Sequence, residues 1–145
     1  IVKTAARFKE DLLISSFPLR TKAVKETQES QPEISFEALS LGIKDYVGKN
    51  GFEKVVVGVS GGIDSAVVVS LAALSLGRKN VYALIMPSRY TSKDTFRDAL
   101  RICKNLGIKH SIVPIDDIFN SYMDSFKELF RGYPADKTEE NIQAR

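Results

Sequence analysis

The feature of this 145-residue sequence that most constrains its fold is a valine run that leads directly into a glycine-rich turn. Residues 55–59 (Val-Val-Val-Gly-Val) are continuously apolar rather than alternating, which is typical of a strand buried on both faces of a parallel sheet. Residues 62–76 then form a nearly all-apolar helical stretch that Gly77 ends. A buried strand, a tight turn and a helix are predicted in that order. The charge of Asp64 and the glycines inside this stretch argue against a membrane-spanning helix.

The same rhythm continues toward the C-terminus. Strands and helices are predicted to alternate at residues 81–86, 92–106, 108–115 and 117–131. In the last helix the residues expected to face inward are Ile118, Tyr122, Phe126 and Leu129. Short connections between alternating elements imply right-handed crossovers and a three-layer, Rossmann-like α/β fold with a parallel sheet. The strands are expected in the order third, second, first, which leaves an apolar edge, so we expect a homo-oligomer.

The first third of the chain is organised differently. Residues 21–33 are polar with one proline and are predicted to form a linker. A helical pattern begins at Ser35, the expected N-cap, and ends at Gly51, which suits the left-handed C-cap conformation. Residues 1–20 include a short strand-like run at residues 12–14.

Charge and cysteine content exclude several classes of protein. The net charge is only +3, without a block of like charge, so neither a nucleic-acid nor a membrane partner is expected. The single cysteine, Cys103, excludes an internal disulfide and a four-cysteine zinc site, and it fits a reducing, cytoplasmic location. Cys103 and the single histidine, His110, are interpreted as structural residues. The N-terminus, Ile1-Val2-Lys3, has no signal-peptide pattern.

The glycine-rich turn is the candidate functional site. Glycines between a strand and a helix let the backbone approach a ligand, and the helix N-terminus favours an anion, most simply a phosphate. The Walker A pattern is excluded because no lysine occurs between Lys54 and Lys79. The dinucleotide fingerprint is excluded because the second strand ends Ile85-Met86-Pro87, without an acidic residue. The plainer alternative is a tight turn in which Asp64 only complements the helix dipole.

The hexapeptide of residues 60–65 (Ser-Gly-Gly-Ile-Asp-Ser) is similar to the pyrophosphate-loop (PP-loop) signature of the AMP-forming ATP pyrophosphatases. In that interpretation Asp64 is the metal ligand, because Mg²⁺ takes carboxylate and phosphate oxygens together. The hydroxyls of Ser60 and Ser65 would donate to the pyrophosphate. The residues expected to bind ATP in this turn are Gly58, Val59, Ser60, Gly61, Gly62, Ile63, Asp64 and Ser65.

Several further segments resemble NAD synthetases of the glutamine-dependent type. They are residues 41–52, 86–92 and 138–145, while residues 7–13 resemble the last strand of the nitrilase-like glutaminase domain of those enzymes. The resemblance implies a glutaminase remnant over residues 1–20, a linker over 21–33, and the N-terminal part of the synthetase domain over 34–145. The synthetase fold is of the adenine nucleotide alpha hydrolase-like type. The match stops within a motif, so a truncated domain, inactive alone, is expected.

The resemblance also implies a reaction. ATP would bind with its adenine near residues 84–86, including Met86, and the nicotinate carboxylate of deamido-NAD would attack the α-phosphate. Ammonia, made from glutamine in the parent enzyme, would then displace AMP to give NAD. Positioning and charge stabilisation suffice for this chemistry, so no protein nucleophile is expected.

On the substrate side the resemblance points to Asn141 and Arg145 as contacts to deamido-NAD, and Arg89 is a candidate for phosphate or substrate. Arg89 as a solvated loop cation, and Asn141 as part of a helix start, remain the plainer alternatives. Two rival functions also remain: another AMP-forming synthetase or tRNA-modifying enzyme, and a non-catalytic nucleotide-binding module.

Overall fold

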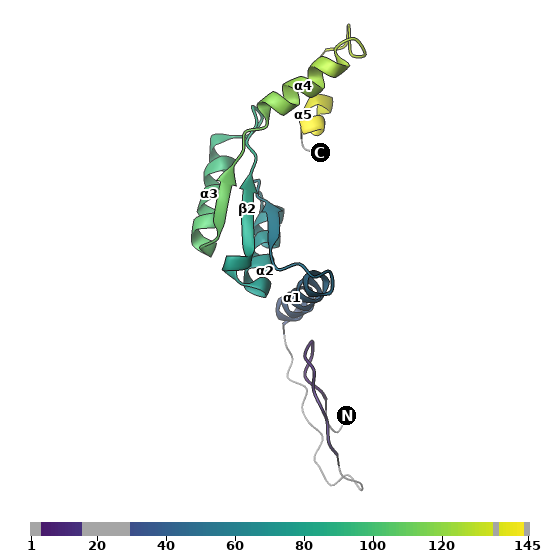
Figure 1. Cartoon of the computed structure of the whole chain (residues 1–145), viewed down its shortest axis with the longest axis vertical. Coiled ribbons are helices and arrows are strands. Elements are labelled where there is room, and N and C mark those ends of the chain that lie inside the picture. Colours follow the sequence, from purple (N-terminus) through teal and green to yellow (C-terminus); the bar gives the residue numbers. More distant parts are fainter. Residues whose placement is uncertain (1–3, 16–29, 135–136, 144–145) are drawn as a thin grey trace.

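The valine run forms the edge strand of a parallel sheet, as the sequence predicts. The computed structural model describes residues 4–15, 30–134 and 137–143. Strand β1 (Val55–Gly58) pairs in parallel with β2 (Val81–Ile85), which pairs in parallel with β3 (Lys109–Ile112). The order β1-β2-β3 confirms the predicted sheet, and the carboxyl ends of all three strands therefore meet at one edge (Figure 1).

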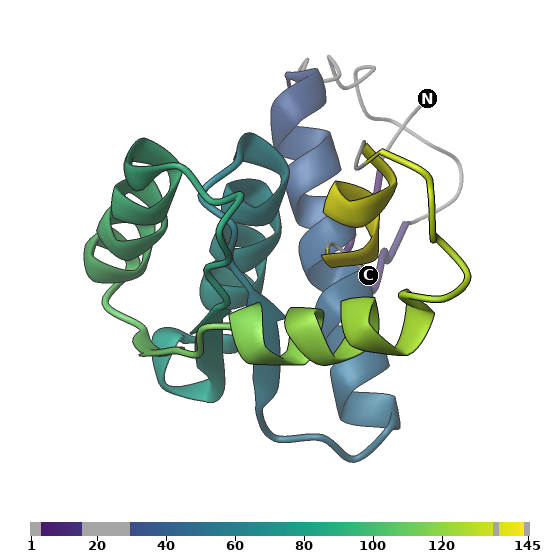
Figure 2. The ribbon, with the colours of Figure 1, turned by 90° about the horizontal axis from the view of Figure 1, so that it is seen from above.

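Two helices cover one face of this sheet. Helix α2 (Ile63–Leu76) contacts β1 and β2, α3 (Lys93–Leu106) contacts β2, and the two helices contact each other, as Figure 2 shows from above. Alternate strand residues point toward these helices, which is why Val81 and Ala83 are buried. The fully buried residues of the helices are Val69, Ala99 and Cys103.

The opposite face of the sheet is open within the described residues. Val56 in β1 is 69% exposed, and Val113, directly after β3, is 41% exposed. The expectation that the valine run is buried on both faces is therefore wrong within the described residues, because no element covers this face there. Tyr82 also lies on this face, where its hydroxyl is 2.7 Å from the Ser111 hydroxyl. The described part of the chain thus supplies two of the three layers of the Rossmann-like fold, the sheet and one helical layer.

Helix α1 (Gln31–Lys49) starts four residues earlier than Ser35, where the sequence analysis placed its N-cap. The N-cap is Ser30, whose N–H and hydroxyl both donate to the Glu33 carboxylate, at 3.0 and 2.8 Å. This capping box, with Pro32 in the first turn, explains the earlier start, so the predicted linker ends before Ser30. The other end agrees with the prediction, since Gly51 has φ +71°. Helix α1 packs against α2.

The C-terminal helices extend away from the sheet. Helix α4 (Asp116–Phe126) is shorter than predicted and is followed by turns, and α5 (Lys137–Gln143) contacts it (Figure 1). The predicted inward stripe is wrong: Ile118 and Tyr122 are 58% and 55% exposed, whereas Phe119 is buried at 5%. The reason is that α4 leads away from the sheet (Figure 1), and Phe119 packs edge-on against the Tyr90 ring of the loop before α3. A short 3₁₀ helix, η1 (Arg78–Asn80), precedes β2.

The predicted strand around residues 12–14 is not formed within the described residues 4–15. Leu12 and Ile14 are 81% and 74% exposed. Residues 16–29, which include most of the predicted linker, lie outside the described residues. In the described part of the chain, no helix has the length and apolar character to cross a bilayer.

Candidate functional site

The turn between β1 and α2 is tied together by two serine hydroxyls. The Ser60 N–H donates to the Ser65 hydroxyl oxygen at 3.2 Å, and the two hydroxyl oxygens are 3.1 Å apart. The Gly62 N–H donates to the Ser60 hydroxyl oxygen at 3.2 Å, and the Ser65 hydroxyl donates to the Gly62 carbonyl at 3.0 Å. The structure thus brings together both serines that the sequence predicts as phosphate donors, and it shows that they also hold the shape of the turn.

Gly61 is required by two independent features of this turn. Its φ of +90° lies in the region that glycine tolerates and other residues rarely adopt. A Cβ atom built on Gly61 would also lie 2.0 Å from the Thr95 carbonyl oxygen, in the first turn of α3. The turn therefore packs directly against a second helix, and only a residue without a side chain permits that approach.

The N-terminus of α2 presents unpaired amides beside an acidic residue. The first helical hydrogen bond runs from the Ala66 N–H to the Gly62 carbonyl, so the amides of residues 63–65 have no partner within the helix. Together with the helix dipole these amides favour an anion. Asp64 and Ile63 are exposed on the same turn, and Asp64 is the acidic residue of the first turn. An anion and a carboxylate at one helix end can coexist if a cation lies between them.

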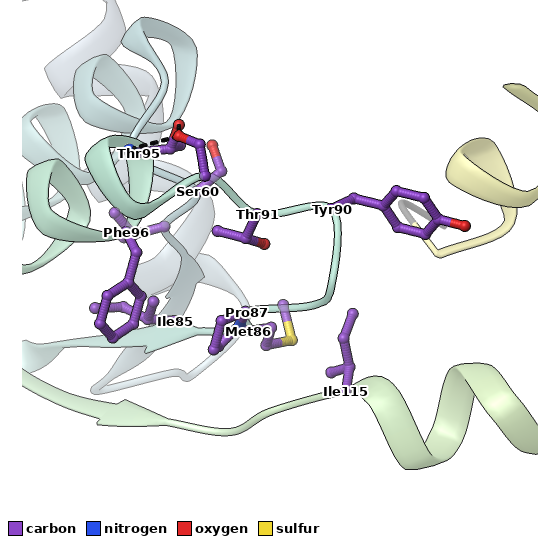
Figure 3. A pocket seen from close by; sticks show the side chains of 11 residues that line it. Ser60, Ile85, Met86, Pro87, Tyr90, Thr91, Thr95, Phe96 and Ile115 are labelled. Atoms are coloured by element: carbon purple, nitrogen blue, oxygen red, sulfur yellow. Dashed lines mark hydrogen bonds between the residues drawn. The ribbon is translucent and has the colours of Figure 1, made fainter.

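A cavity of about 400 Å³ opens beside this turn at the carboxyl ends of β1 and β2 (Figure 3). Its walls come from the turn, the end of β2, the loop of residues 86–92, the first turn of α3 and Ile115. The lining is mainly apolar, with hydroxyls near the turn. The residues that line it are Val59, Ser60, Ile85, Met86, Pro87, Tyr90, Thr91, Ser92, Thr95, Phe96 and Ile115. An apolar slot beside an anion-binding turn matches the shape of a nucleotide, with a flat base and a charged tail.

Several residues predicted to bind ATP lie at this cavity in different ways. Met86 lines it and lies beside Gly58, since a Cβ on Gly58 would be 3.6 Å from the Met86 methyl carbon. Val59 is only 2% exposed, and its N–H donates to the Leu84 carbonyl at 2.9 Å. Val59 therefore belongs to the hydrophobic core and also lines the cavity.

Arg89 makes contacts that the sequence did not predict. Its backbone N–H and its Nε both donate to Asp116 Oδ1, at 3.0 and 3.3 Å, and its Nη2 donates to Asn120 Oδ1 at 2.5 Å. The guanidinium also lies over the Phe119 ring, 5.2 Å from its centroid. The N-cap position of α4 is Ile115, and Asp116, the first residue of the helix, accepts from Arg89.

The other two substrate-side candidates lie apart from the cavity or outside the described residues. Asn141 is exposed on α5 and is not among the residues that line the cavity. Arg145 lies outside the described residues.

Most residues of the cavity wall were not among the predicted site residues, and Thr95, Phe96 and Ile115 lie outside every segment that the sequence assigned to the nucleotide. Thr95 could have been found from its position in the sequence, three residues after Ser92. Ser92 is the N-cap of α3, and its hydroxyl oxygen accepts from the Thr95 N–H at 3.0 Å. A serine followed by a threonine three residues later marks a helix start, and helix starts at this edge of the sheet face the ligand. Ile115 carried no signal, since it reaches the cavity only through the tertiary fold.

The residues set aside by the sequence analysis stay outside this site. Cys103 is fully buried in α3, and burial raises the pKa of its thiol above the usual range. His110 is exposed on β3 and is not part of the cavity lining. Within the described ranges, no group of three or more His, Cys, Asp or Glu side chains is placed to hold a metal ion. A metal at Asp64 would therefore need phosphate oxygens and water as its other ligands, which is how Mg²⁺ is often bound.

Comparisons with known proteins agree with this geometry. The family model described as NAD synthase matches residues 35–145. The chain is 53% identical over 113 residues to the glutamine-dependent NAD(+) synthetase of Thermotoga maritima, covering 78% of this chain and 20% of that protein. It is 38% identical to the Synechocystis enzyme of the same name, covering 100% of this chain and 27% of that protein.

Among solved structures, the chain is similar to the glutamine-dependent NAD+ synthetase of Acinetobacter baumannii in complex with adenosine diphosphate. The TM-score is 0.76 at 36% identity, over 85% of this chain and 24% of that chain. The chain thus spans between a fifth and about a quarter of the length of these relatives.

Proposed function

Because this chain belongs to the NAD synthase family, we propose that it forms the ATP-binding part of an enzyme that amidates deamido-NAD to NAD. The observation that carries the proposal is the turn at the end of β1, which the Ser60 and Ser65 hydroxyls hold in shape and which adjoins a cavity of about 400 Å³. An anion-binding turn next to an apolar slot suits ATP, with the phosphates on the turn and the adenine near Met86. The relative from Acinetobacter baumannii, solved with adenosine diphosphate, supports a nucleotide as the ligand.

Each residue of the turn has a role in this proposal. Gly61 and Gly62 leave the backbone open to the phosphates, and the amides of residues 63–65 donate to them. The hydroxyl oxygens of Ser60 and Ser65 are 3.1 Å apart, and each accepts a hydrogen bond from a backbone N–H. Each hydroxyl can therefore rotate its own proton toward a phosphate oxygen without losing the bond that it accepts. Fixed donors of this kind stabilise the charge that develops on the departing pyrophosphate.

Asp64 is the proposed magnesium ligand. A carboxylate at this position would repel phosphates unless a cation bridges them, and the exposed Asp64 side chain in the first turn of α2 is free to reach such a cation. Magnesium bound there would neutralise phosphate charge and help to orient the triphosphate.

The proposed reaction has two steps. The nicotinate carboxylate of deamido-NAD attacks the α-phosphate of ATP and releases pyrophosphate, and ammonia then displaces AMP to form the amide of NAD. Asn141 and Arg145 are proposed to bind deamido-NAD. Glutamine is the proposed source of ammonia, through a glutaminase domain of the parent enzyme, as the names of the relatives suggest.

The test of this proposal is calorimetric titration of the chain with ATP in the presence and absence of magnesium. We expect magnesium-dependent binding that Asp64→Ala abolishes, without loss of helix content by circular dichroism. Asp98→Ala is the matched control, because Asp98 is an exposed carboxylate on α3 that pairs with Arg101. Unchanged, magnesium-dependent affinity in Asp64→Ala would rule out the metal role, and absence of ATP binding by the unmodified chain would rule out the ATP-binding function.

A further inference from the structure

Arg89 connects the loop of residues 86–92 to helix α4 through three kinds of contact. Its backbone N–H and Nε reach Asp116, its Nη2 reaches Asn120, and its guanidinium lies 5.2 Å from the centre of the Phe119 ring. All three partners lie in the first two turns of α4. Two of the three guanidinium nitrogens and one face of the guanidinium therefore contact one helix.

Other contacts join the same two segments. The Ile115 N–H, immediately before α4, donates to the Pro87 carbonyl at 3.1 Å. The Tyr90 ring packs edge-on against Phe119, with the centroids 5.7 Å apart. Within the loop, the Thr91 N–H donates to the Ser88 carbonyl at 2.9 Å, and the Ser88 N–H donates to the Thr91 hydroxyl oxygen at 3.0 Å. The loop is therefore closed by its own hydrogen bonds between Ser88 and Thr91, and its Arg89 and Tyr90 side chains contact α4.

The residues of this loop and of the α4 start form one wall of the cavity. Met86 and Thr91 come from the loop and Ile115 precedes α4, and Figure 3 shows Ile115 directed toward the space below Thr91. Without the Arg89 side chain, the two segments would be joined only by the Arg89 N–H bond to Asp116, the Pro87 carbonyl bond and the Tyr90 ring contact with Phe119. The width of the cavity therefore depends on a junction that Arg89 makes.

We propose that Arg89 is a positioning residue that fastens the loop of residues 86–92 to α4 and so sets the wall of the nucleotide cavity. This inference rests on the proposed function, because it takes the cavity to be the nucleotide site, but it replaces direct binding of phosphate or substrate by Arg89. The affinity of a nucleotide falls in proportion to the fraction of molecules in which the wall is in place.

The discriminating ligands are adenosine and ATP. If Arg89 positions the wall, Arg89→Ala weakens the binding of both ligands by a similar factor, about five- to tenfold. If Arg89 contacts phosphate, the variant weakens ATP binding and leaves adenosine unchanged, which overturns the proposal. Arg89→Lys is expected to recover little of the lost affinity, because an ammonium cannot reproduce the two directed bonds and the ring contact.

The double variant Arg89→Ala with Asn120→Ala tests whether the two residues act together. It is expected to bind both ligands almost as well as Arg89→Ala alone, whereas fully additive losses of affinity count against the proposal.

A measurement without ligand separates this inference from the proposed function. Hydrogen exchange of the Arg89 and Ile115 amides is expected to accelerate about five- to tenfold in Arg89→Ala. Arg97→Ala is the matched control, since Arg97 is an exposed arginine that pairs with Asp94 on α3, and it should leave both amides unchanged. Unchanged exchange in Arg89→Ala overturns the positioning role. A chain that binds neither ligand refutes the ATP site, while the exchange data still decide whether Arg89 holds the loop.

Discussion

At the scale of single residues, the structure makes Gly61 the least replaceable position of the turn. Gly61→Ala should lower the free energy of unfolding by about 2 kcal/mol or more, because it combines a strained backbone with a clash. The clash is the contact of 2.0 Å with the Thr95 carbonyl. The measurement is urea denaturation followed by circular dichroism.

Gly62→Ala is the matched control for this substitution. The φ of Gly62 is −78°, and the nearest atom to an added Cβ is the Ser60 hydroxyl oxygen at 3.5 Å, an ordinary contact. Gly62→Ala should therefore lower the free energy of unfolding by less than about 1 kcal/mol. Equal losses in the two variants would mean that the approach of Thr95 is not what selects glycine at position 61.

Cys103 gives a second expectation at this scale. The thiol is fully buried, and burial raises its pKa, so less thiolate is present at a given pH than in an exposed cysteine. Iodoacetamide should therefore alkylate the folded chain at least about tenfold more slowly than the chain in denaturant. Equal alkylation rates would show that α3 opens readily or that the thiol is accessible in the folded state.

The sequence predicted residue types better than residue contacts. The glycines of the turn could be selected because glycines between a strand and a helix indicate an anion site, and the serines and Asp64 because the hexapeptide resembles the PP-loop signature. The packing of Gly61 on Thr95 and the contacts of Arg89 could not be predicted, because each joins segments that meet only in the folded chain. Val59 was predicted to bind ATP, and its side chain lies in the core beside the cavity, because the end of a strand contributes both to the core and to the site.

At the scale of the elements, the start of α1 gives a pH-dependent expectation. The N–H and hydroxyl of Ser30 hydrogen-bond the Glu33 carboxylate and lower its pKa. A carboxylate whose folded pKa is lowered stabilises the helix above the unfolded pKa, and this stabilisation is lost as the pH falls through the folded pKa. Helix content should therefore drop between about pH 5 and pH 3, and Glu33→Gln, which keeps an acceptor, should reduce that drop.

Glu37→Gln is the control for the capping box, because Glu37 lies one turn further along the same helix and outside the cap. Far-UV circular dichroism between neutral and acidic pH gives the measurement. Identical pH profiles for the two variants would show that the capping box does not set the acid sensitivity of α1.

Element types were predicted correctly more often than element ends. Strands β1 and β2 and helix α2 follow continuous apolar runs, α3 follows a clear helical period, and Gly77 ends α2 as the sequence suggests. The start of α1 was misplaced because the apolar stripe begins after the cap. Helix α4 was extended too far, and its buried face was misjudged, because its partner is the loop of residues 86–92 rather than the sheet.

At the scale of the whole molecule, the open face of the sheet favours association between chains. Val56 is 69% exposed on the edge strand β1, whose outer edge has no partner among the described residues. Exposed apolar edges of this kind pair with other chains. Val56→Lys should therefore shift sedimentation-velocity profiles toward monomer. Leu74→Lys, at a position 65% exposed on α2, should leave the profiles unchanged, and the same effect from both would point to net charge instead.

Catalysis is the second expectation at this scale. The described residues contain no cluster of three metal-ligating side chains, and the face of the sheet opposite α2 and α3 is uncovered. A site that is open to water and holds its metal through one carboxylate lacks the preorganisation that this chemistry needs. The chain is therefore expected to form no NAD from ATP, deamido-NAD and ammonia, with an intact glutamine-dependent NAD synthetase as the positive control. Measurable turnover would show that these 145 residues suffice.

The sheet order has a consequence for how this protein folds. Each strand pairs with the next one along the chain, with a single helix between partners. A parallel pair forms only when the whole crossover between its strands has closed, so this pairing is slower than that of a hairpin. Gly61 lies in the first crossover and Thr95 in the second, and the turn therefore acquires its working shape only when both crossovers have closed.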